Sequence, residues 1–254
     1  MHQSADYVII MEAQDKTRAI VIKAVRYGDS SLIVRLLTED SGLQSFMVKG
    51  AFSKNAKMRA ALFQPLTLLD IVRSRSRGEL GFLKETSLNH SYHSIPFEMN
   101  KNAIVLFISE LLSKTIQEAE TDTELFGFIY DALISLDETG NSYADFPLMF
   151  SIELSRHLGF APNTDGFKSG FIFNLEDGCF HQNGYRMSYI IDSQMTEKFF
   201  DLCNSNIMEN KKLNIRNSER RSLLDSMITY YKLHVAGFND IKSCDILRTV
   251  LESA

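Results

Sequence analysis

The stretch RAIVIKAVRYGDSSLIVRLLTEDSG, at residues 18–42, holds two runs of Val, Ile and Leu separated by Tyr-Gly-Asp-Ser. Such runs favour strands, and a Gly-Asp-Ser segment between them is typical of a turn. Three similar runs follow, LQSFMVKG at 43–50, LTLLDIVRS at 66–74 and ELGFLKET at 79–86. Residues 18–86 therefore predict five strands.

The connection between the third and fourth of these strands is the long one. Within it KMRAALFQ, at 57–64, has the Ala, Leu, Met and Lys content of a short helix that ends at Gln64 and Pro65. Five strands with a helix after the third follow the chain order of an OB barrel. The open face and the loops of that fold bind single strands of nucleic acid.

From about residue 98 the apolar side chains recur at the period of a helix. The expected helices have apolar faces at Ile104–Thr115 and Leu125–Leu136, a third helix lies at roughly 143–158, and a fourth surrounds Leu223–Tyr231. The third is expected to stop at Gly159, with Pro162 just beyond.

Between the third and fourth helices lies a segment rich in Gly, Asn and Asp, with apolar pairs around Glu-Asp-Gly, which predicts a small β-hairpin. We therefore expect an α+β protein in two parts. A five-stranded OB-fold β-barrel occupies residues 1–82, and an all-α helical C-terminal domain occupies residues 83–254, with the hairpin inserted at about 163–190.

Composition excludes several classes of protein. The chain has 254 residues, 44% of them hydrophobic, which is enough to form a substantial core. It contains no apolar run of membrane-spanning length, and its opening lacks the pattern of a secretory signal, so we expect a cytoplasmic protein without a membrane partner. Cys179, Cys203 and Cys244 are widely spaced and odd in number, which favours reduced thiols over a disulfide framework.

Positive charge is concentrated in the N-terminal part. Residues 1–80 hold 12 Lys and Arg against 8 Asp and Glu, a balance of +4, whereas the remainder has a balance of −9. The stretch VKGAFSKNAKMRAALFQP, at 48–65, contains four cations and no acidic residue. Because it lies beside the expected barrel face, we interpret it as a surface that contacts nucleic-acid phosphates.

The candidate DNA-binding residues extend from this stretch onto the strands and the later helices. They are Lys49, Lys54, Lys57 and Arg59 in the basic stretch, Arg18, Arg35, Arg73, Arg75 and Arg77 on the strands or their ends, and Arg220 and Arg221 in the helical part. Arg26 adds to the strand set, and Lys242 and Arg248 extend the helical set. Phe46, Phe52 and Phe63 are candidates for stacking on bases.

Signatures of catalysis are weak. The chain has no GxxxxGK[ST], HExxH or GxSxG motif. Tyr-Gly-Asp-Ser-Ser-Leu at 27–32 is similar to the nucleophile block of GDSL hydrolases, with Ser30 as the nucleophile, but the late His234 has Tyr231 where that family places an Asp. A serine without a base is not activated. We therefore interpret residues 27–32 as a turn and expect no enzymatic activity.

Metal-binding patterns are also weak. Cys179 and His181 lie two residues apart and His90 and His93 three apart, but neither pair has a second pair at the spacing of a zinc site. We expect no bound metal and no cofactor.

Taken in order, several segments make the chain similar to the RecO family of bacterial recombination mediators. The similar segments in the N-terminal part are AIVIKAVRYGDSSLIVRLLTEDSG at 19–42, VKGAFSK at 48–54 and LFQPLTLLDI at 62–71. Those in the helical part are ELFGFIYDAL at 124–133, LSRHLGFAPN at 154–163 and YYKLHVAGFNDIKSCDIL at 230–247.

The resemblance implies a function without catalysis. Such a protein binds single- and double-stranded DNA, anneals complementary strands and helps to load recombinase onto strands coated by single-strand-binding protein, and so acts in DNA repair and recombination at the nucleoid. The implied partners are RecR and the acidic tail of the single-strand-binding protein. Many members carry four zinc-binding cysteines in the insertion, whereas FNLEDGCF keeps only Cys179.

Three alternatives remain open. The first is an OB-fold protein that binds RNA, the second is the hydrolase with Ser30 as nucleophile, and the third is an adaptor that does not contact nucleic acid.

Overall fold

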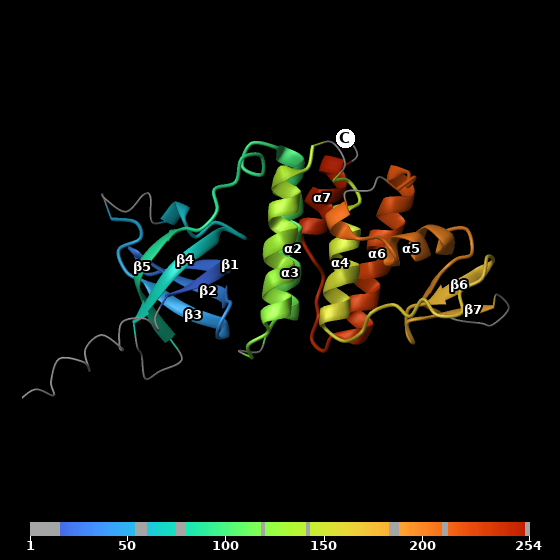
Figure 1. Cartoon of the computed structure of the whole chain (residues 1–254), viewed down its shortest axis with the longest axis horizontal. Coiled ribbons are helices and arrows are strands. Elements are labelled where there is room, and N and C mark those ends of the chain that lie inside the picture. The colour runs from blue at the N-terminus through green and yellow to red at the C-terminus, as the bar shows by residue number, and fades with distance from the viewer. Residues whose placement is uncertain are drawn as a thin grey trace, which may run out of the picture. The chain divides into compact units, whose positions relative to one another are not determined.

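The structure is a computed structural model that describes residues 16–53, 60–74, 80–117, 120–140, 143–182, 188–209 and 213–251. The chain divides into two compact units (Figure 1). The barrel unit holds the described residues up to Ser91 together with Ile116–Tyr130. The helical unit holds Tyr92–Thr115 and the residues from Asp131 onward.

The barrel unit contains the five expected strands, which confirms the OB-type barrel. They are β1 (Lys16–Tyr27), β2 (Ser31–Thr38), β3 (Gly42–Val48), β4 (Leu68–Ser74) and β5 (Leu80–Leu88). They close in the order β1-β2-β3-β5-β4, and every pair is antiparallel except β3 and β5, which are parallel. Figure 1 shows these strands in blue to green.

Alternation along β2 determines which side chains fill the barrel. Leu32, Val34 and Leu36 are buried, whereas Ile33 and Arg35 between them are half-buried. The inward positions form one core cluster with Ala19, Val21, Phe46, Leu69 and Ile71 on neighbouring strands, and with Phe63 from the connection after β3. Burying each large aliphatic side chain contributes on the order of 1.5–3 kcal/mol, so this cluster stabilises the barrel.

A β-bulge in β1 changes the direction of its side chains. Val21 pairs with Leu36, but the next aligned pair is Lys23 with Arg35, so Ile22 is the additional residue. Side chains alternate along a strand with a period of two, and an inserted residue reverses which positions face inward. Val21 therefore lies in the core while Lys23 is exposed.

The barrel closes through a short parallel seam between β3 and β5. Ser45 aligns with Leu80, Phe46 with Gly81 and Met47 with Phe82. A Cβ atom at Gly81 would lie 2.8 Å from the ring of Phe46, closer than carbon atoms approach one another. Glycine at this position therefore lets the Phe46 ring fill the barrel beneath the seam.

Two expected bounds in the barrel need comment, the end of the fifth strand and the helix after the third strand. β5 continues to Leu88, so a domain boundary after residue 82 would cut through the closing strand. The helix expected at 57–64 lies partly outside the described residues, although Ala60 and Ala61 are helical and the Phe63 N–H donates to the Ala60 carbonyl at 3.2 Å.

The described chain after the barrel strands contains the helices expected from the apolar periodicity, together with two short α-helices and a short 3-10 helix that were not expected. The α-helices are α2 (Met99–Thr115), α3 (Thr123–Glu138), α4 (Phe146–His157), α5 (Thr196–Cys203), α6 (Asn217–His234) and α7 (Ser243–Leu251), and η1 (Ile207–Glu209) is a short 3-10 helix. The division between the two units falls within α3, after Tyr130. α4 has Pro147 in its first turn, and Gly159 follows its end with a φ of 82°. None of the described helices is both long and apolar enough to cross a membrane.

The expected hairpin is present as part of a small sheet. β6 (Phe171–Asn174) pairs with β7 (Cys179–Gln182) on one side and with β8 (Ile190–Ile191) on the other. Gly178 turns the chain into β7 with a φ of 68°, and a Cβ atom there would lie 2.6 Å from the Tyr230 hydroxyl. That hydroxyl donates to the Phe160 carbonyl at 2.7 Å. Close packing on α6 therefore holds the turn.

A buried cation organises the polar interior of the helical unit. Lys101, on α2, is 1% exposed, and its Nζ donates to Ser94 Oγ at 2.6 Å and to the carbonyls of Asp137 and Thr139 at 3.1 and 2.7 Å. These carbonyls lie at the end of α3, where a helix leaves acceptors without partners. Lys101 therefore caps α3.

The Asp137 carboxylate reinforces this cap. It accepts the backbone N–H groups of His93, Ser94 and Ile95 at 2.7–2.9 Å. Burial alone would raise the pKa of Asp137, but these hydrogen bonds outweigh burial and hold the pKa below its usual value. The carboxylate therefore stays ionised and fixes the segment that leads into α2.

Candidate nucleic-acid interface

The outer surface of β1, β2, β3 and β5 brings basic, apolar and aromatic side chains together. One cross-strand row consists of Val25, Ile33, Met47 and Phe82, and the next consists of Lys23, Arg35, Ser45 and Leu80. Tyr27 and Ser31 form the pair on the other side of the apolar row, and Lys49 directly follows β3. We name these positions together the barrel face.

The barrel face exposes large apolar side chains and carries positive charge. Val25, Tyr27 and Phe82 are 50%, 56% and 38% exposed, although they are large apolar residues. None of its positions carries an Asp or a Glu. Within the described part of the chain, no hydrogen bond or ion pair joins the side chain of Lys23 or Arg35 to another residue. These cations are therefore available to phosphate groups.

Lys49 lies over an aromatic ring. Its Nζ is 5.0 Å from the centroid of Phe82. At the neighbouring end of the barrel, Arg26 covers Phe52 at 4.9 Å and donates to the Asp29 carbonyl at 3.0 Å. Phe52 is 44% exposed, so it keeps the accessibility that base stacking requires.

The two other aromatic candidates have a structural role. Phe46 is 2% and Phe63 is 4% exposed, and both belong to the core cluster of the barrel. The prediction that they stack on bases is wrong, because a ring inside the barrel cannot reach a nucleotide.

Arg18 is engaged within the barrel unit. Its guanidinium forms a double hydrogen bond to Glu39 at 2.8 and 2.6 Å and lies over the ring of Tyr130 at 4.8 Å. The hydrogen bond from Arg18 lowers the pKa of Glu39. Because the positive charge is neutralised by an adjacent carboxylate, we remove Arg18 from the set of proposed phosphate contacts.

Arg73 is similarly occupied. Its side chain is 17% exposed, and it pairs with Asp40 at 2.6 Å and donates to Ser41 Oγ at 2.9 Å. These contacts join β4 to the turn after β2. Arg73 is therefore a structural cation, and we also remove it from the set.

Arg220 forms a buried ion pair in the helical unit. It donates to Asp145 at 2.8 Å, with the two side chains 11% and 8% exposed, and to the Ile215 carbonyl at 3.1 Å. This pair joins the residue before α4 to the first turn of α6. Arg220 was expected to contact DNA, but the structure places it in a packed joint between helices. Its neighbour Arg221 is exposed.

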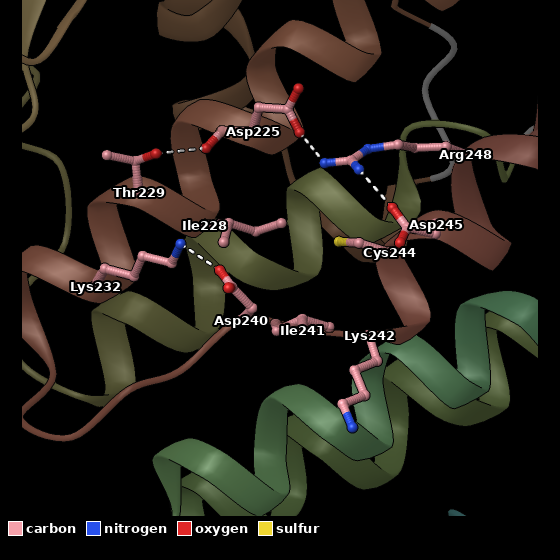
Figure 2. Close-up of a pocket in the computed structure, with 10 residues that line it drawn as sticks. All are labelled: Asp225, Ile228, Thr229, Lys232, Asp240, Ile241, Lys242, Cys244, Asp245 and Arg248. Carbon is pink, nitrogen blue, oxygen red and sulfur yellow. Dashed lines mark hydrogen bonds and ion pairs between the residues drawn. The ribbon is translucent and has the colours of Figure 1, made fainter.

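Lys242 and Arg248, the other two candidates of the helical part, line a pocket of about 380 Å³ between α6 and α7 together with Lys232, as Figure 2 shows. Arg248 pairs with Asp225 and with Asp245, and Lys232 pairs with Asp240 at 2.5 Å. Figure 2 shows the Lys242 side chain directed away from these two charge clusters. The pocket therefore presents mostly neutralised charge.

The N-terminus of α7 is occupied by a side chain of the protein. Glu110 accepts the backbone N–H groups of Lys242 and Ser243 at 3.0 and 2.9 Å and the Ser243 hydroxyl at 2.7 Å. Burial opposes ionisation, but these hydrogen bonds outweigh it and lower the pKa of Glu110. A helix N-terminus attracts anions, and here the carboxylate of α2 takes that place.

Five of the expected contacts lie outside the described residues. Lys54, Lys57 and Arg59 fall within 54–59, and Arg75 and Arg77 fall within 75–79. They stay predictions. Both segments adjoin described parts of the barrel, the first following Ser53 and the second joining β4 to β5.

Ser30 lies in a turn, as its sequence context suggested. Gly28 has a φ of 61°, and the Ser30 carbonyl accepts the Phe52 N–H at 3.2 Å. The Nε2 atom of His234, the only late histidine, hydrogen-bonds to the Leu175 carbonyl at 2.9 Å. These contacts give neither residue the geometry of an activated nucleophile and its base.

Metal ligands are not gathered in the described ranges, where no group of three or more His, Cys, Asp and Glu residues is arranged to hold an ion. His181 instead pairs with Asp177 at 2.8 Å, and Cys179 has a raised pKa, chiefly because of burial. The metal content of the purified protein stays a prediction.

Comparison with known proteins agrees with this architecture. Residues 11–92 match the family model for the recombination protein O N terminal region, and residues 96–185 match that for the recombination protein O C terminal region. The chain belongs to the RecO family.

Relatives in the RecO family match almost the whole chain. The DNA repair protein RecO of Christiangramia forsetii is 34% identical over 92% of this chain and 98% of its own length. Those of Flavobacterium psychrophilum and Bacteroides fragilis are 35% and 32% identical, each over 93% of this chain and 99% of the relative. The assignment to a family of DNA repair and recombination proteins therefore covers both units.

Proposed function

We propose that the protein is a DNA-binding recombination mediator that uses the barrel face to hold DNA. On this proposal it binds single- and double-stranded DNA, anneals complementary strands and assists the loading of recombinase onto strands coated by single-strand-binding protein. RecR and the acidic tail of the single-strand-binding protein are the proposed protein partners. The proposed role involves no catalytic step.

One observation carries the DNA-binding proposal. The barrel face combines Lys23, Arg35 and Lys49 with exposed apolar side chains and includes no carboxylate. Cations that are not neutralised by a carboxylate can release counterions from a phosphate backbone, and phosphate contacts do not depend on sequence. Membership of the RecO family supports the same role.

Annealing requires positioning and charge neutralisation. Two complementary strands repel each other through their phosphates, so a surface that neutralises both lets their bases approach and pair. The charge balance of +4 in residues 1–80 against −9 in the remainder favours the barrel unit for this task, because DNA is attracted by the first and repelled by the second.

The test is a triple variant, Lys23→Ala with Arg35→Ala and Lys49→Ala, titrated with labelled single strands of two different sequences at several salt concentrations. We expect a similar loss of affinity for both sequences. The slope of log affinity against log salt should fall by roughly 0.7 for each phosphate that the variant no longer neutralises. Urea unfolding should verify that the variant is folded.

A matched control removes three exposed cations of the helical unit, Lys168, Arg221 and Lys242. This control changes the net charge equally, and we expect it to keep the salt slope. A second triple, Lys54→Ala with Lys57→Ala and Arg59→Ala, tests the basic stretch. If only the helical control loses DNA binding, the proposal for the barrel face is wrong. Parallel titration with RNA of the same sequence separates the DNA-binding role from the RNA-binding alternative.

A further inference from the structure

We propose that the barrel face distinguishes unpaired bases from duplex DNA through Phe82 and Tyr27, and that Lys49 moves from the Phe82 ring to a phosphate when a base stacks there. This inference rests on the proposed function, since it concerns how the same face selects its ligand.

The two rings lie on different strands of the barrel face. Tyr27 ends β1 and is 56% exposed, while Phe82 lies on β5 and is 38% exposed. The apolar row from Val25 to Phe82 crosses four strands, which spans roughly 14 Å at the usual strand spacing. A single strand lying along this row would meet an aromatic ring near each end and cations along the flanks.

The Phe82 ring has two possible partners, the Lys49 ammonium group and a nucleotide base. In the structure Lys49 Nζ lies 5.0 Å from the ring centroid. An exposed cation–π contact of this kind changes an equilibrium by about two- to fivefold. Stacking of a base on an aromatic side chain changes binding by roughly five- to 150-fold. A base therefore displaces Lys49, and the released ammonium group gains a phosphate as its new partner.

Single strands and duplexes differ in whether their bases are free to stack on these rings. In a duplex each base is already stacked and paired, and exposing it costs energy. The rings of Tyr27 and Phe82 consequently add nothing to duplex binding, whereas Lys23 and Arg35 can meet phosphates of either form. The face should favour single strands by the amount that stacking contributes.

The experiment uses the full-length protein and three labelled ligands of equal length: an oligo-dT strand, an abasic strand with the same phosphates and no bases, and a duplex. The variant is Tyr27→Leu with Phe82→Leu, which keeps apolar side chains and removes the rings. Tyr189→Leu is the matched control, since Tyr189 is a 44% exposed aromatic residue of the helical unit.

We expect the unmodified protein and the Tyr189→Leu control to bind oligo-dT at least fivefold more tightly than the abasic strand. The double variant should bind these two ligands equally, with duplex affinity unchanged within twofold. Equal binding of oligo-dT and abasic strands by the unmodified protein would overturn the inference and leave the proposed function standing. A preference for oligo-dT that survives in the double variant would also overturn it. Failure to bind any of the three ligands would contradict the proposed function itself.

The displacement of Lys49 has its own readout. In Lys49→Met the salt slope for oligo-dT should fall by roughly 0.7, because methionine cannot neutralise the phosphate that Lys49 would meet. The slope for the abasic strand should not change, because no base displaces Lys49 from Phe82 in that complex. An equal fall for both ligands would show that Lys49 contacts phosphate without any exchange, and would overturn this part of the inference.

Discussion

Lys23 and Arg35 of the barrel face and the cations Lys101, Arg220 and Arg248 of the helical unit have opposite surroundings. Lys23 and Arg35 lie on an outer surface without a carboxylate at any of its positions. In the helical unit Arg220 and Arg248 are paired with Asp145 and with Asp225 and Asp245, and Lys101 is buried against carbonyl groups. Cations that already have partners stabilise the fold, whereas cations without them can bind a ligand.

This difference shows why a count of positive residues does not locate a binding surface. Arg18 and Arg73 belong to the basic N-terminal part, but each lies against an acidic side chain. Releasing either arginine to a phosphate would leave that carboxylate without its partner. Cations that are paired with a carboxylate must therefore be left out when the positive residues available to DNA are counted.

The largest expected effect is a loss of unfolding free energy when the buried pair of Asp145 and Arg220 is broken. Asp145→Ala leaves Arg220 without its carboxylate, and breaking a buried pair in this way costs about 3–5 kcal/mol of unfolding free energy. Urea denaturation measures the loss, and DNA affinity below the transition should match that of the unmodified protein. A loss under about 1 kcal/mol, the usual upper value for an exposed pair, would show that Arg220 is not a structural cation and would weaken the contrast with the barrel face.

A smaller loss of stability is expected from Lys101→Met. Methionine fills the same space but cannot donate to the carbonyls of Asp137 and Thr139. Leaving buried acceptors without donors costs about 1–3 kcal/mol. Thermal and urea unfolding should both report it. Lys242→Met is the matched control, since Lys242 is exposed and should tolerate the change.

Low pH should lower the stability of the helical unit, because the Asp137 carboxylate becomes protonated. Its pKa in the folded state lies below the value of the unfolded chain, which is about 3.9. The carboxylate therefore stabilises the fold above about pH 4, and this contribution is lost as the pH falls through the folded-state pKa. Asp137→Asn should be less stable at neutral pH and should show a flatter decline below about pH 4. If the two proteins lost stability in parallel as the pH falls, the stabilising role of the ionised Asp137 carboxylate would be contradicted.

The smallest expected effect is that of Arg221→Ala. Arg221 is exposed on α6, and exposed surface substitutions change stability by less than about half a kcal/mol. DNA affinity should also stay within twofold. A loss of DNA binding comparable with that of Lys23→Ala would show that the interface includes the helical unit. The contrast between the two sets of cations would then be wrong.

The sequence predicts the barrel well because its strands are long apolar runs with clear turns. It misses α5 and α7, which have 8 and 9 residues. Helices of this length are marginal in isolation and form through tertiary packing. In α7 that support includes the Glu110 carboxylate, which comes from a residue distant in the chain.

The interface is harder to predict, and the bulge in β1 explains why. Strict alternation from Ala19 and Val21, both in the core, places Lys23, Val25 and Tyr27 inside the barrel. The additional residue at Ile22 turns these three side chains outward. The exposure of Phe82 is hard to predict for a related reason. Whether a phenylalanine on a strand points outward depends on the alignment of that strand with its neighbour, here Phe82 with Met47. The information needed is the register between strands, and no local pattern contains it.

The parallel seam between β3 and β5 has a consequence for how the barrel folds. The β1–β2 and β2–β3 hairpins join neighbours in the chain, whereas the seam brings Phe46 beside Gly81 across a long intervening segment. Closing such a loop carries an entropic cost that local hairpins avoid, and non-local pairing slows folding. We therefore expect the three-stranded meander of β1, β2 and β3 to form first and the barrel to close afterwards. Until β5 docks, the side of Phe46 that Gly81 covers is open to water, so amide exchange during refolding should record protection of β3 on its β2 side before its β5 side.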